Sequence, residues 1–315
     1  IEIELNSNAI FNTPLQYSYI YVIIKLHLRK GINTIYYRIS KYFMIKLIAS
    51  DMDGTLLSEK KHIDPPQKKA VHKAIEAGVK VVLCTGRPLF GILPPYKELE
   101  LEKYNLDEYV LLNNGCSVHK TTDWELLAFE EITKEDVVYL NELRKGYDLD
   151  FTVSNDKDYF VIGERANEYT KEDGKLVYVE VQPISIEEAT SGKHTFFKSM
   201  FLGNENEIAR FVKDKGELIN SRYSGVLSQK YIYETLPKGA NKGVALKKLA
   251  EKLNIPREEV MAIGDGNNDI EMLKFAGVGV AMGNGTKMAK DAANYITDTN
   301  ENNGVAKAIE KFLGE

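Results

Sequence analysis

The chain has 315 residues, of which 43% are hydrophobic and 28% are charged, and its formal net charge at pH 7 is −5. This mild acidity, with no dense block of lysine and arginine, gives no electrostatic basis for a nucleic-acid or membrane-surface partner. The length is sufficient for two domains with a substantial hydrophobic core.

Residues 1–43 differ in composition from the rest of the chain. They begin with Ile and are rich in Ile, Tyr and Asn, and their longest apolar run, residues 17–24, is too short to cross a bilayer. They also lack the pattern of a secretory signal. Clear strand patterning starts at Met44, so we expect residues 1–43 to be an extension outside the fold.

From Met44 onward, apolar runs alternate with amphipathic segments. Residues 45–50, 79–85 and 109–114 are apolar runs of strand length, and a helical pattern opens at Pro65 and ends near Gly78. Runs that are apolar throughout and are separated by helices predict parallel strands buried on both faces. The connections between such strands are expected to be right-handed crossovers.

The pattern changes between about residues 127 and 236. Strand-like stretches alternate apolar and polar residues there, and they are separated by helical patterns, which predicts an α+β module with a mainly antiparallel sheet. The expected strands lie within residues 150–163, 175–184, 194–202 and 224–236, and the expected helices within 132–147 and 205–216.

The first pattern then resumes and continues to the end of the chain. Strands are expected at 260–265, 278–282 and 295–298, and helices at 242–254, 269–276, 286–293 and 304–313. We therefore predict an α/β fold: a Rossmann-like, doubly wound parallel-sheet core formed by residues 44–126 and 237–315. The α+β module of residues 127–236 is expected to be inserted into this core.

Polar residues follow several of the predicted core strands. Ligands bind at the carboxyl ends of strands in open parallel sheets, so these residues are expected to meet at one edge of the sheet. They are Asp51 and Asp53 after the first strand, Thr85, Gly86 and Arg87 after the second, Asn113 and Asn114 after the third, and Asp265, Asn268 and Asp269 after the strand at 260–265, with Lys242 at the start of the preceding helix.

These residue types suit phosphoryl chemistry. Close carboxylates repel each other unless a cation compensates, and an all-oxygen ligand set favours Mg²⁺. Thr85, the amides beside Gly86 and Lys242 form a cradle for an anion. One carboxylate could then attack phosphorus while a second, two residues on, moves the proton.

Each stretch also has a simpler interpretation. The sequence DMDG at 51–54 could be an ordinary strand-ending turn, and Lys242 could be a solvated helix lysine. The sequence GDGNND at 264–269 lacks the spacing and the distal Glu of a calcium-binding EF-hand loop. Turn chemistry does not explain why all of these features lie at strand ends and in this order.

The four stretches resemble the motifs of the haloacid dehalogenase superfamily of phosphotransferases. DMDGT at 51–55, TGR at 85–87, Lys242 in NKG and GDGNND at 264–269 occur in that superfamily's order. The resemblance extends from about Met44 to the C-terminus. Within the superfamily, the chain resembles more specifically the Cof-type group, in which a large α+β cap lies between the second and third motifs.

The resemblance implies a role for each motif residue. Asp51 would be the nucleophile and a Mg²⁺ ligand. Asp53 would be the general acid and base and would offer its backbone carbonyl to the metal. Thr85 and Lys242 would hold the phosphoryl oxygens, and Asp265 would ligate Mg²⁺.

Three further residues would support these. Gly86 would contribute to phosphate binding, while Asn268 and Asp269 would orient the phosphate or metal-bound waters. The expected function is a Mg²⁺-dependent phosphatase that acts on small phosphorylated metabolites through an aspartyl-phosphate. Sugar phosphates are the substrates expected ahead of other metabolites.

Two alternatives remain open: a phosphomutase of the same superfamily, and a non-catalytic sugar-phosphate sensor.

The two cysteines, Cys84 and Cys116, lie in apolar stretches and are too few for a disulfide framework. We therefore expect reduced thiols and a cytoplasmic protein. Its partner would be a small phosphate ester, with no nucleic acid and no membrane, and the chain would be a monomer or a weak homodimer.

Overall fold

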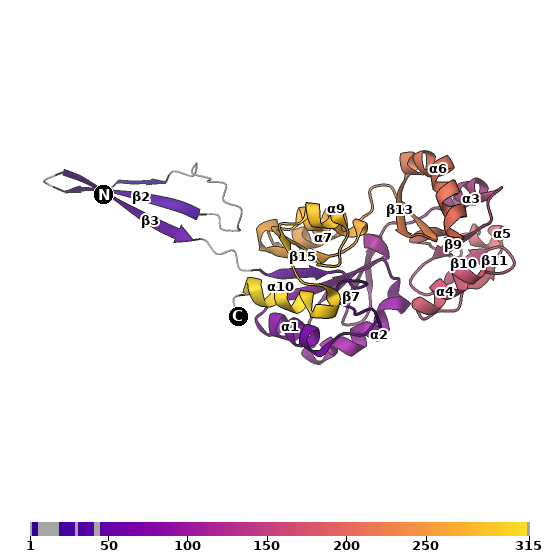
Figure 1. The fold of residues 1–315 in the computed structure, drawn as a ribbon, viewed down its shortest axis with the longest axis horizontal. Coiled ribbons are helices and arrows are strands. Elements are labelled where there is room, and N and C mark those ends of the chain that lie inside the picture. The colour runs from indigo at the N-terminus through magenta and orange to yellow at the C-terminus, as the bar shows by residue number, and fades with distance from the viewer. Residues whose placement is uncertain (1, 6–18, 29–30, 41–44, 314–315) are drawn as a thin grey trace. The chain divides into compact units, whose positions relative to one another are not determined.

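The structure is a computed structural model that describes residues 2–5, 19–28, 31–40 and 45–313 (Figure 1). The chain divides into two compact units, Ile1–Met44 and Ile45–Glu315. In the described part of the first unit, three strands form an antiparallel sheet in the order β1-β2-β3. These strands are β1 (Glu2–Leu5), β2 (Tyr19–Leu28) and β3 (Gly31–Ser40).

The expectation that residues 1–43 are an extension outside the fold stays a prediction. Residues 1, 6–18, 29–30 and 41–43 of that stretch lie outside the described residues.

The second unit contains an eight-stranded sheet in the order β17-β16-β15-β4-β5-β6-β7-β8. The first six strands in this order are parallel, and β7 and β8 extend the sheet in antiparallel fashion beyond β6. The strands are β4 (Leu47–Ser50), β5 (Lys80–Cys84), β6 (Tyr109–Leu112), β7 (Ser117–Lys120), β8 (Leu126–Phe129), β15 (Val260–Gly264), β16 (Val278–Ala281) and β17 (Tyr295–Ile296).

Helices cover both faces of this sheet, which is the predicted doubly wound α/β arrangement (Figure 1). Alternate residues of β4 show the two layers: Ile48 packs with α1, α2 and α10, whereas Leu47 and Ala49 pack with α7, α8 and α9. Both faces are therefore buried, and this explains the continuous apolar runs. The helices are α1 (Pro65–Glu76), α2 (Leu89–Leu99), α7 (Lys242–Lys252), α8 (Ile270–Phe275), α9 (Lys287–Ala292) and α10 (Gly304–Leu313).

A second sheet of six strands has the order β11-β10-β9-β12-β14-β13. All of its pairings are antiparallel except that of β10 with β11. Its strands are β9 (Leu149–Ser154), β10 (Tyr159–Ile162), β11 (Gln182–Ile184), β12 (Lys198–Gly203), β13 (Tyr223–Gln229) and β14 (Ile232–Pro237).

The helices of this second part are α3 (Lys134–Arg144), α4 (Glu168–Leu176), α5 (Ile186–Ala189) and α6 (Glu205–Arg222). The core of the second part contains an aromatic group in which Phe201 of β12 lies against Phe151 and Phe211. The opposite face of β12 carries Met200, which belongs to a cluster that also contacts Phe90 of α2. The second sheet thus faces the first part of the unit through that side, where it meets α2.

The expected boundary between residues 126 and 127 falls inside β8. Because β8 pairs with β7 of the eight-stranded sheet, we propose that the inserted module runs from residue 130 to Pro237, and we call it the cap. The chain on either side of the cap forms the core.

Several local predictions were wrong. The expected strand at 175–184 is instead the end of α4, an irregular stretch and the short β11. The stretch 224–236 is a hairpin of β13 and β14 rather than one strand. Helix α2 was not predicted, because Pro94 and Pro95 lie inside it and proline argues against a helix interior.

Five short 3₁₀ turns complete the described secondary structure: Leu101–Tyr104, Asn113–Gly115, Arg257–Glu259, Asn267–Asp269 and Asn300–Asn302. Among the described residues, no helix is both long and apolar enough to cross a lipid bilayer.

Candidate active site

The site is built where the strand order of the core reverses. From β4 the chain continues outward through β5 and β6, and it later returns to β15 on the other side of β4. Asp51 follows β4 and Asp265 follows β15, and the amide N–H of Asp51 donates to the carbonyl oxygen of Ile263 at 2.9 Å. Such a reversal creates a crevice at the strand ends, so the fold itself brings these two aspartates together.

Lys242 links two of the carboxylates. Its side chain is completely buried, and its Nζ lies 2.5 Å from Oδ1 of Asp51 and 2.7 Å from Oδ1 of Asp269. Burial alone would lower the pKa of Lys242, but the charges of Asp269 and Asp51 raise it above its ordinary value, so the lysine carries a positive charge. Lys242 thereby compensates part of the negative charge at the strand ends.

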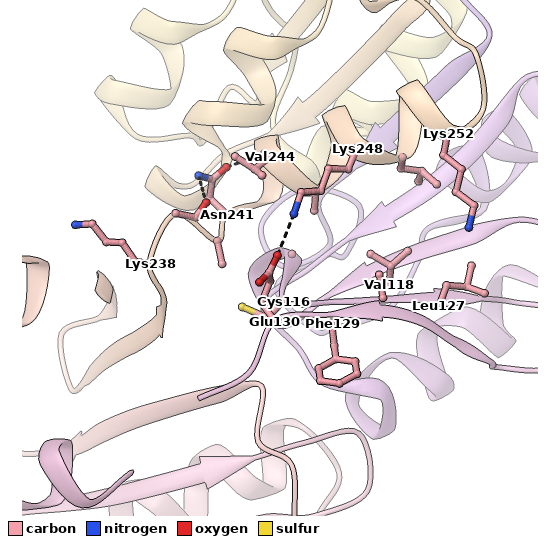
Figure 2. Close-up of a pocket in the computed structure, with 16 residues that line it drawn as sticks. Cys116, Val118, Leu127, Phe129, Glu130, Lys238, Asn241, Val244, Lys248 and Lys252 are labelled. Carbon is pink, nitrogen blue, oxygen red and sulfur yellow. Dashed lines mark hydrogen bonds and ion pairs between the residues drawn. The ribbon is translucent and has the colours of Figure 1, made fainter. Parts of the chain in front are cut away.

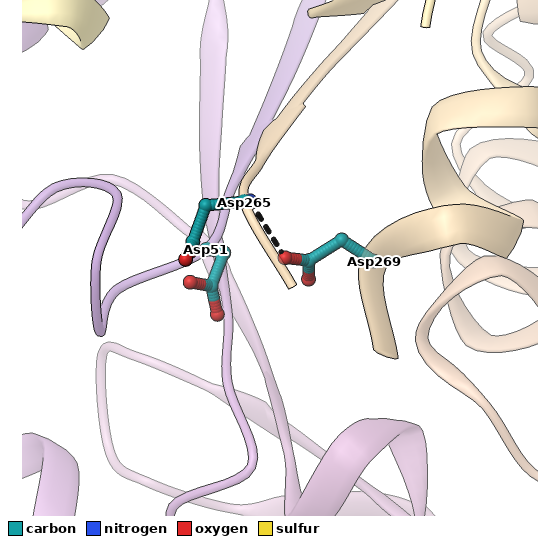
Figure 3. A group of neighbouring side chains, drawn as sticks. All are labelled: Asp51, Asp265 and Asp269. Carbon is teal, nitrogen blue, oxygen red and sulfur yellow. Dashed lines mark hydrogen bonds between the residues drawn. The ribbon is translucent and has the colours of Figure 1, made fainter. Parts of the chain in front are cut away.

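Asp269 has little coordinating capacity left. One of its oxygens accepts from Lys242, and the other accepts from the backbone N–H groups of Asp265 and Gly266 at 2.9 and 2.8 Å. Its carboxylate therefore fixes the loop that carries Asp265, as Figure 3 shows for the bond to the Asp265 amide. This geometry favours a supporting role for Asp269.

Asp51, Asp265 and Asp269 form an acidic cluster in which Asp51 and Asp265 are the candidate cation ligands and Asp269 supports them. One oxygen from each lies within 4.8 Å of the others (Figure 3). Burial raises the pKa of Asp51 well above its ordinary value, and the charge of Asp269 raises it further, against Lys242. Burial and then Asp269 raise the pKa of Asp265 to about 6. A hard divalent cation would relieve this repulsion, and carboxylate oxygens are the donors that Mg²⁺ takes.

Asp53 has an environment opposite to that of Asp51. Arg87 donates to both of its oxygens, from Nε at 2.7 Å and from Nη2 at 2.8 Å, and Lys61 adds a third contact at 2.7 Å. Burial alone would raise the pKa of Asp53, but the hydrogen bonds and charge of Arg87, followed by those of Lys61, lower it to about 2. Arg87, whose role the sequence left undecided, thus pairs with Asp53.

The predicted phosphate-binding residues lie around the same space. Thr85 is buried, and its hydroxyl accepts from the amide of Arg87 at 3.1 Å. A Cβ on Gly86 would come within 3.2 Å of the Asn114 side chain, so the backbone passes close to that amide. Asn268 reaches the same group, since its Nδ2 donates to Oδ1 of Asn114 at 2.9 Å.

Asn114 connects the core to the cap. Its Nδ2 donates to Oε2 of Glu234, on β14 of the cap, at 2.8 Å. Glu234 also lies 3.6 Å from Nζ of Lys198, which in turn donates to the carbonyl oxygen of Gly86 at 3.0 Å. Asn114 adopts a positive φ of 56°, a conformation that asparagine tolerates better than most non-glycine residues.

A cavity of about 420 Å³ joins these groups. Its floor is formed by the core residues Asp51, Asp53, Thr85, Gly86 and Asp265 together with Asn268. Its roof comes from the cap and mixes polar with apolar side chains. The polar ones are Ser154, Tyr159, Asp173, Lys198, Ser228, Gln229, Tyr231 and Glu234.

Sequence reasoning did not identify the cap residues that line the cavity. Several polar residues of the cap, namely Arg165, Asn167, Lys193 and His194, do not line it. Asn167 instead caps α4, where its side chain accepts from the amide of Thr170. Alternation along β12 was the available signal, because Lys198 and Met200 point to the face opposite Phe201.

The chain is similar to known proteins over most of its length. A family model described as haloacid dehalogenase-like hydrolase matches residues 48–309. The chain is also 32% identical over 271 residues to the 5-amino-6-(5-phospho-D-ribitylamino)uracil phosphatase YcsE of Bacillus subtilis, covering 85% of this chain and 96% of that protein.

Solved structures show the same fold. A haloacid dehalogenase-like hydrolase from Bacteroides thetaiotaomicron superposes with a TM-score of 0.76 at 31% identity, covering 85% of this chain and 99% of that one. The subclass IIB sugar phosphatase BT4131 superposes with a TM-score of 0.73 at 25% identity, covering 85% of this chain and 98% of that one.

Proposed function

The chain belongs to the haloacid dehalogenase-like hydrolases, as a Cof-type phosphatase and hence a phosphoric monoester hydrolase, and from this premise we propose its substrate class and mechanism. It hydrolyses phosphate monoesters of sugars or sugar-like polyols with Mg²⁺, through an aspartyl-phosphate. One observation carries the proposal: Asp51, which pairs with the buried Lys242, lies with Asp53 and Asp265 in the floor of a cavity whose roof is a set of uncharged and paired polar groups of the cap.

The first chemical step belongs to Asp51. Its carboxylate attacks phosphorus, the bond from phosphorus to the ester oxygen breaks, and protonated Asp53 gives its proton to the departing oxygen. In the present arrangement Arg87 and Lys61 hold Asp53 as a carboxylate. A bound phosphoryl group competes for these two cations and so favours the protonated form that this step requires.

The second step regenerates the enzyme. Asp53, now a carboxylate, takes a proton from water while that water attacks phosphorus, and the bond to Asp51 breaks to release phosphate. Thr85 and Lys242 hold the phosphoryl oxygens. Mg²⁺ held by Asp51 and Asp265 would neutralise charge on the phosphoryl group, and Asp269 would keep Asp265 in place.

The cap half of the cavity favours a hydroxyl-rich leaving group. The ammonium of Lys198 is already shared between Glu234 and the Gly86 carbonyl, and Asp173 adds a second carboxylate. A second phosphate group in the cap half would therefore lie near the carboxylates of Glu234 and Asp173 and near the ammonium of Lys198, which is already paired. This disfavours a phosphomutase that uses a sugar bisphosphate. Sugar hydroxyl groups can donate to Glu234 and Asp173.

The test is a phosphate-release screen of the full chain with Mg²⁺. The panel contains hexose and pentose monophosphates, a ribityl phosphate, and a hexose bisphosphate. We expect turnover of monophosphates, which EDTA abolishes and Mg²⁺ restores, and a loss of about 10³-fold or more in Asp51→Asn. The matched control is Glu59→Gln, an exposed carboxylate beyond the turn, which should keep wild-type turnover.

Wild-type turnover in Asp51→Asn, or turnover without divalent metal, would contradict the mechanism. Preference for the bisphosphate would contradict the substrate class alone.

We also propose a reducing, cytoplasmic setting, which is supported by the free thiols of Cys84 and Cys116.

A further inference from the structure

A second cavity lies where the chain passes between core and cap. The described chain makes this passage twice, after β8 and after β14, and both connecting segments line the cavity: Phe129 and Glu130 on one side, Lys238–Asn241 on the other. Helix α7 and strand β7 complete the walls. Its volume is about 290 Å³, and we call it the hinge groove (Figure 2).

The hinge groove is mainly apolar. Its walls carry Cys116, Val118, Leu127, Val244, Ala245 and Leu249. Two of its large apolar side chains are exposed to solvent, Phe129 to 49% and Val244 to 40%. Apolar cavities of this kind, with a few charged groups at the edge, are typical of small-molecule sites.

The charged groups at its edge are mostly cationic. Lys248 pairs with Glu130 at 2.9 Å, and Lys238 donates to the carbonyl oxygen of Asn220. Lys252 lies one helical turn beyond Lys248 on the same face of α7 (Figure 2). Within residues 45–313, its ammonium makes no hydrogen bond or ion pair, so it is available to a ligand.

The groove also adjoins the active site along the chain. Gly115 and Asn241 line it, and their neighbours Asn114 and Lys242 belong to the catalytic cavity and to the buried carboxylate cluster. The turn at Gly115 and the segment at Asn241 are tightly packed, because a Cβ on Gly115 would come within 2.6 Å of the Asn241 carbonyl oxygen. A ligand in the groove would therefore contact both segments that join the core to the cap, next to residues of the catalytic cavity.

We propose that the hinge groove binds a small amphipathic carboxylate, with its apolar chain among the wall residues and its carboxylate at Lys252, and that this ligand stabilises the closed cap. The described structure is the closed state, since Asn114 and Lys198 both bond across the core–cap junction. A ligand that fits the groove in this state, and less well when the connecting segments separate, shifts the population towards closure. By reciprocity, a ligand in the catalytic cavity tightens binding in the groove.

The test is titration of the full chain with octanoate, followed by NMR chemical shifts, with octanamide as the uncharged ligand of equal length. We expect saturable binding of octanoate and roughly tenfold weaker binding of octanamide, the loss of one charge-assisted contact. Lys252→Gln should weaken octanoate by a similar factor and leave octanamide unchanged. Lys247→Gln, an exposed lysine of the same helix outside the groove, is the control and should change neither.

Equal affinity for octanoate and octanamide, or an unchanged octanoate affinity in Lys252→Gln, would overturn the site. A groove that instead holds a second copy of the chain would give no octanoate binding and a dimer in sedimentation that Val244→Asp dissociates. The coupling is tested separately, by repeating the titration with Mg²⁺ and inorganic phosphate. An octanoate affinity that phosphate leaves unchanged would overturn cap stabilisation.

These binding measurements need no turnover, so they fail independently of the proposed function.

Discussion

The charge balance of the active site depends on one buried cation, Lys242. Removing it leaves Asp51 and Asp269 buried without a counter-charge, and breaking a buried ion pair in this way costs about 3–5 kcal/mol. We predict that Lys242→Met lowers the free energy of unfolding by this amount and that Mg²⁺ restores part of it, because the metal binds only the folded chain. Urea unfolding with and without Mg²⁺ measures both effects.

Lys247→Met is the matched control for Lys242→Met, since Lys247 is an exposed residue of the same helix. It should leave stability and its Mg²⁺ dependence unchanged. If the Lys242→Met chain were as stable as wild type in EDTA, Asp51 and Asp269 would not depend on an ion pair with Lys242, and they would be protonated in the folded chain.

Gly54 provides a second test at the residue scale. It has a φ of +81°, and a Cβ there would come within 2.6 Å of Oδ2 of Asp265. Gly78 has the same φ, but a Cβ there meets nothing within 4 Å. Both Ala variants should lose about 1–2 kcal/mol of stability through backbone strain, and only Gly54→Ala should also lose Mg²⁺ affinity and turnover. Equal turnover in the two variants would show that Asp265 tolerates displacement.

Residue-level prediction from sequence is possible where the information is local. Asp51 and Asp53 stand in one short motif, and Asp265 and Asp269 in another, so their types and spacing could be read without coordinates. Pairs formed across long separations could not. Glu234 is 120 positions from Asn114, and Lys198 is 112 positions from Gly86, so only the folded cap shows that they meet.

At the scale of elements, the buried parallel strands were predictable because the helices on both faces make them apolar throughout. The cap was harder, since one face of its sheet is buried by contact with the core, which the local sequence pattern does not show. Residues 175–181 alternate as a strand does, yet Val177, Val179 and Val181 lie against the apolar cluster on the core-facing side of the cap sheet. Tertiary packing, rather than pairing, explains that alternation.

A histidine joins an element of the core to an element of the cap. His119 of β7 is buried; its Nε2 lies 2.9 Å from Oδ2 of Asp156, in the turn between β9 and β10, and its Nδ1 lies 3.0 Å from the carbonyl oxygen of Trp124. Only the imidazolium form carries a proton on both ring nitrogens and a positive charge beside Asp156. Burial alone would lower the pKa of His119, but its hydrogen bond to Asp156 and that carboxylate's charge raise it.

Because the folded pKa of His119 is raised, the pair stabilises the fold fully below the unfolded value near 6.5, and this contribution disappears as pH rises through the folded value. We predict that His119→Gln costs about 1–3 kcal/mol of unfolding free energy at pH 5.5 and less at pH 9. Urea unfolding at the two pH values measures the difference. His62→Gln, an exposed histidine, is the control, and equal losses from His119→Gln at both pH values would contradict an ionic pair.

At the scale of the whole molecule, neither sheet alone makes the site. The core provides the aspartates of the cavity floor and the cap provides its roof, so the insertion point of the cap determines which strand ends it can cover. Lys198 and Glu234 reach the site only because β12 and β14 are central strands of the cap sheet. Closure of the cap over the core would also exclude water from the phosphoryl group.

The division of the chain at Met44 leads to the last prediction. Every residue assigned to the site lies in the unit Ile45–Glu315. A chain that begins at Met44 should therefore keep the turnover and the thermal midpoint of the full chain. The control chain begins at Met52 and therefore lacks β4, the strand that lies between β5 and β15 and is followed by Asp51. This control chain should fail to fold, because the loss of β4 exposes the edges of β5 and β15 in the middle of the sheet. Circular dichroism melting and phosphate release measure both chains, and loss of folding in the Met44 chain would show that residues 1–43 belong to the fold.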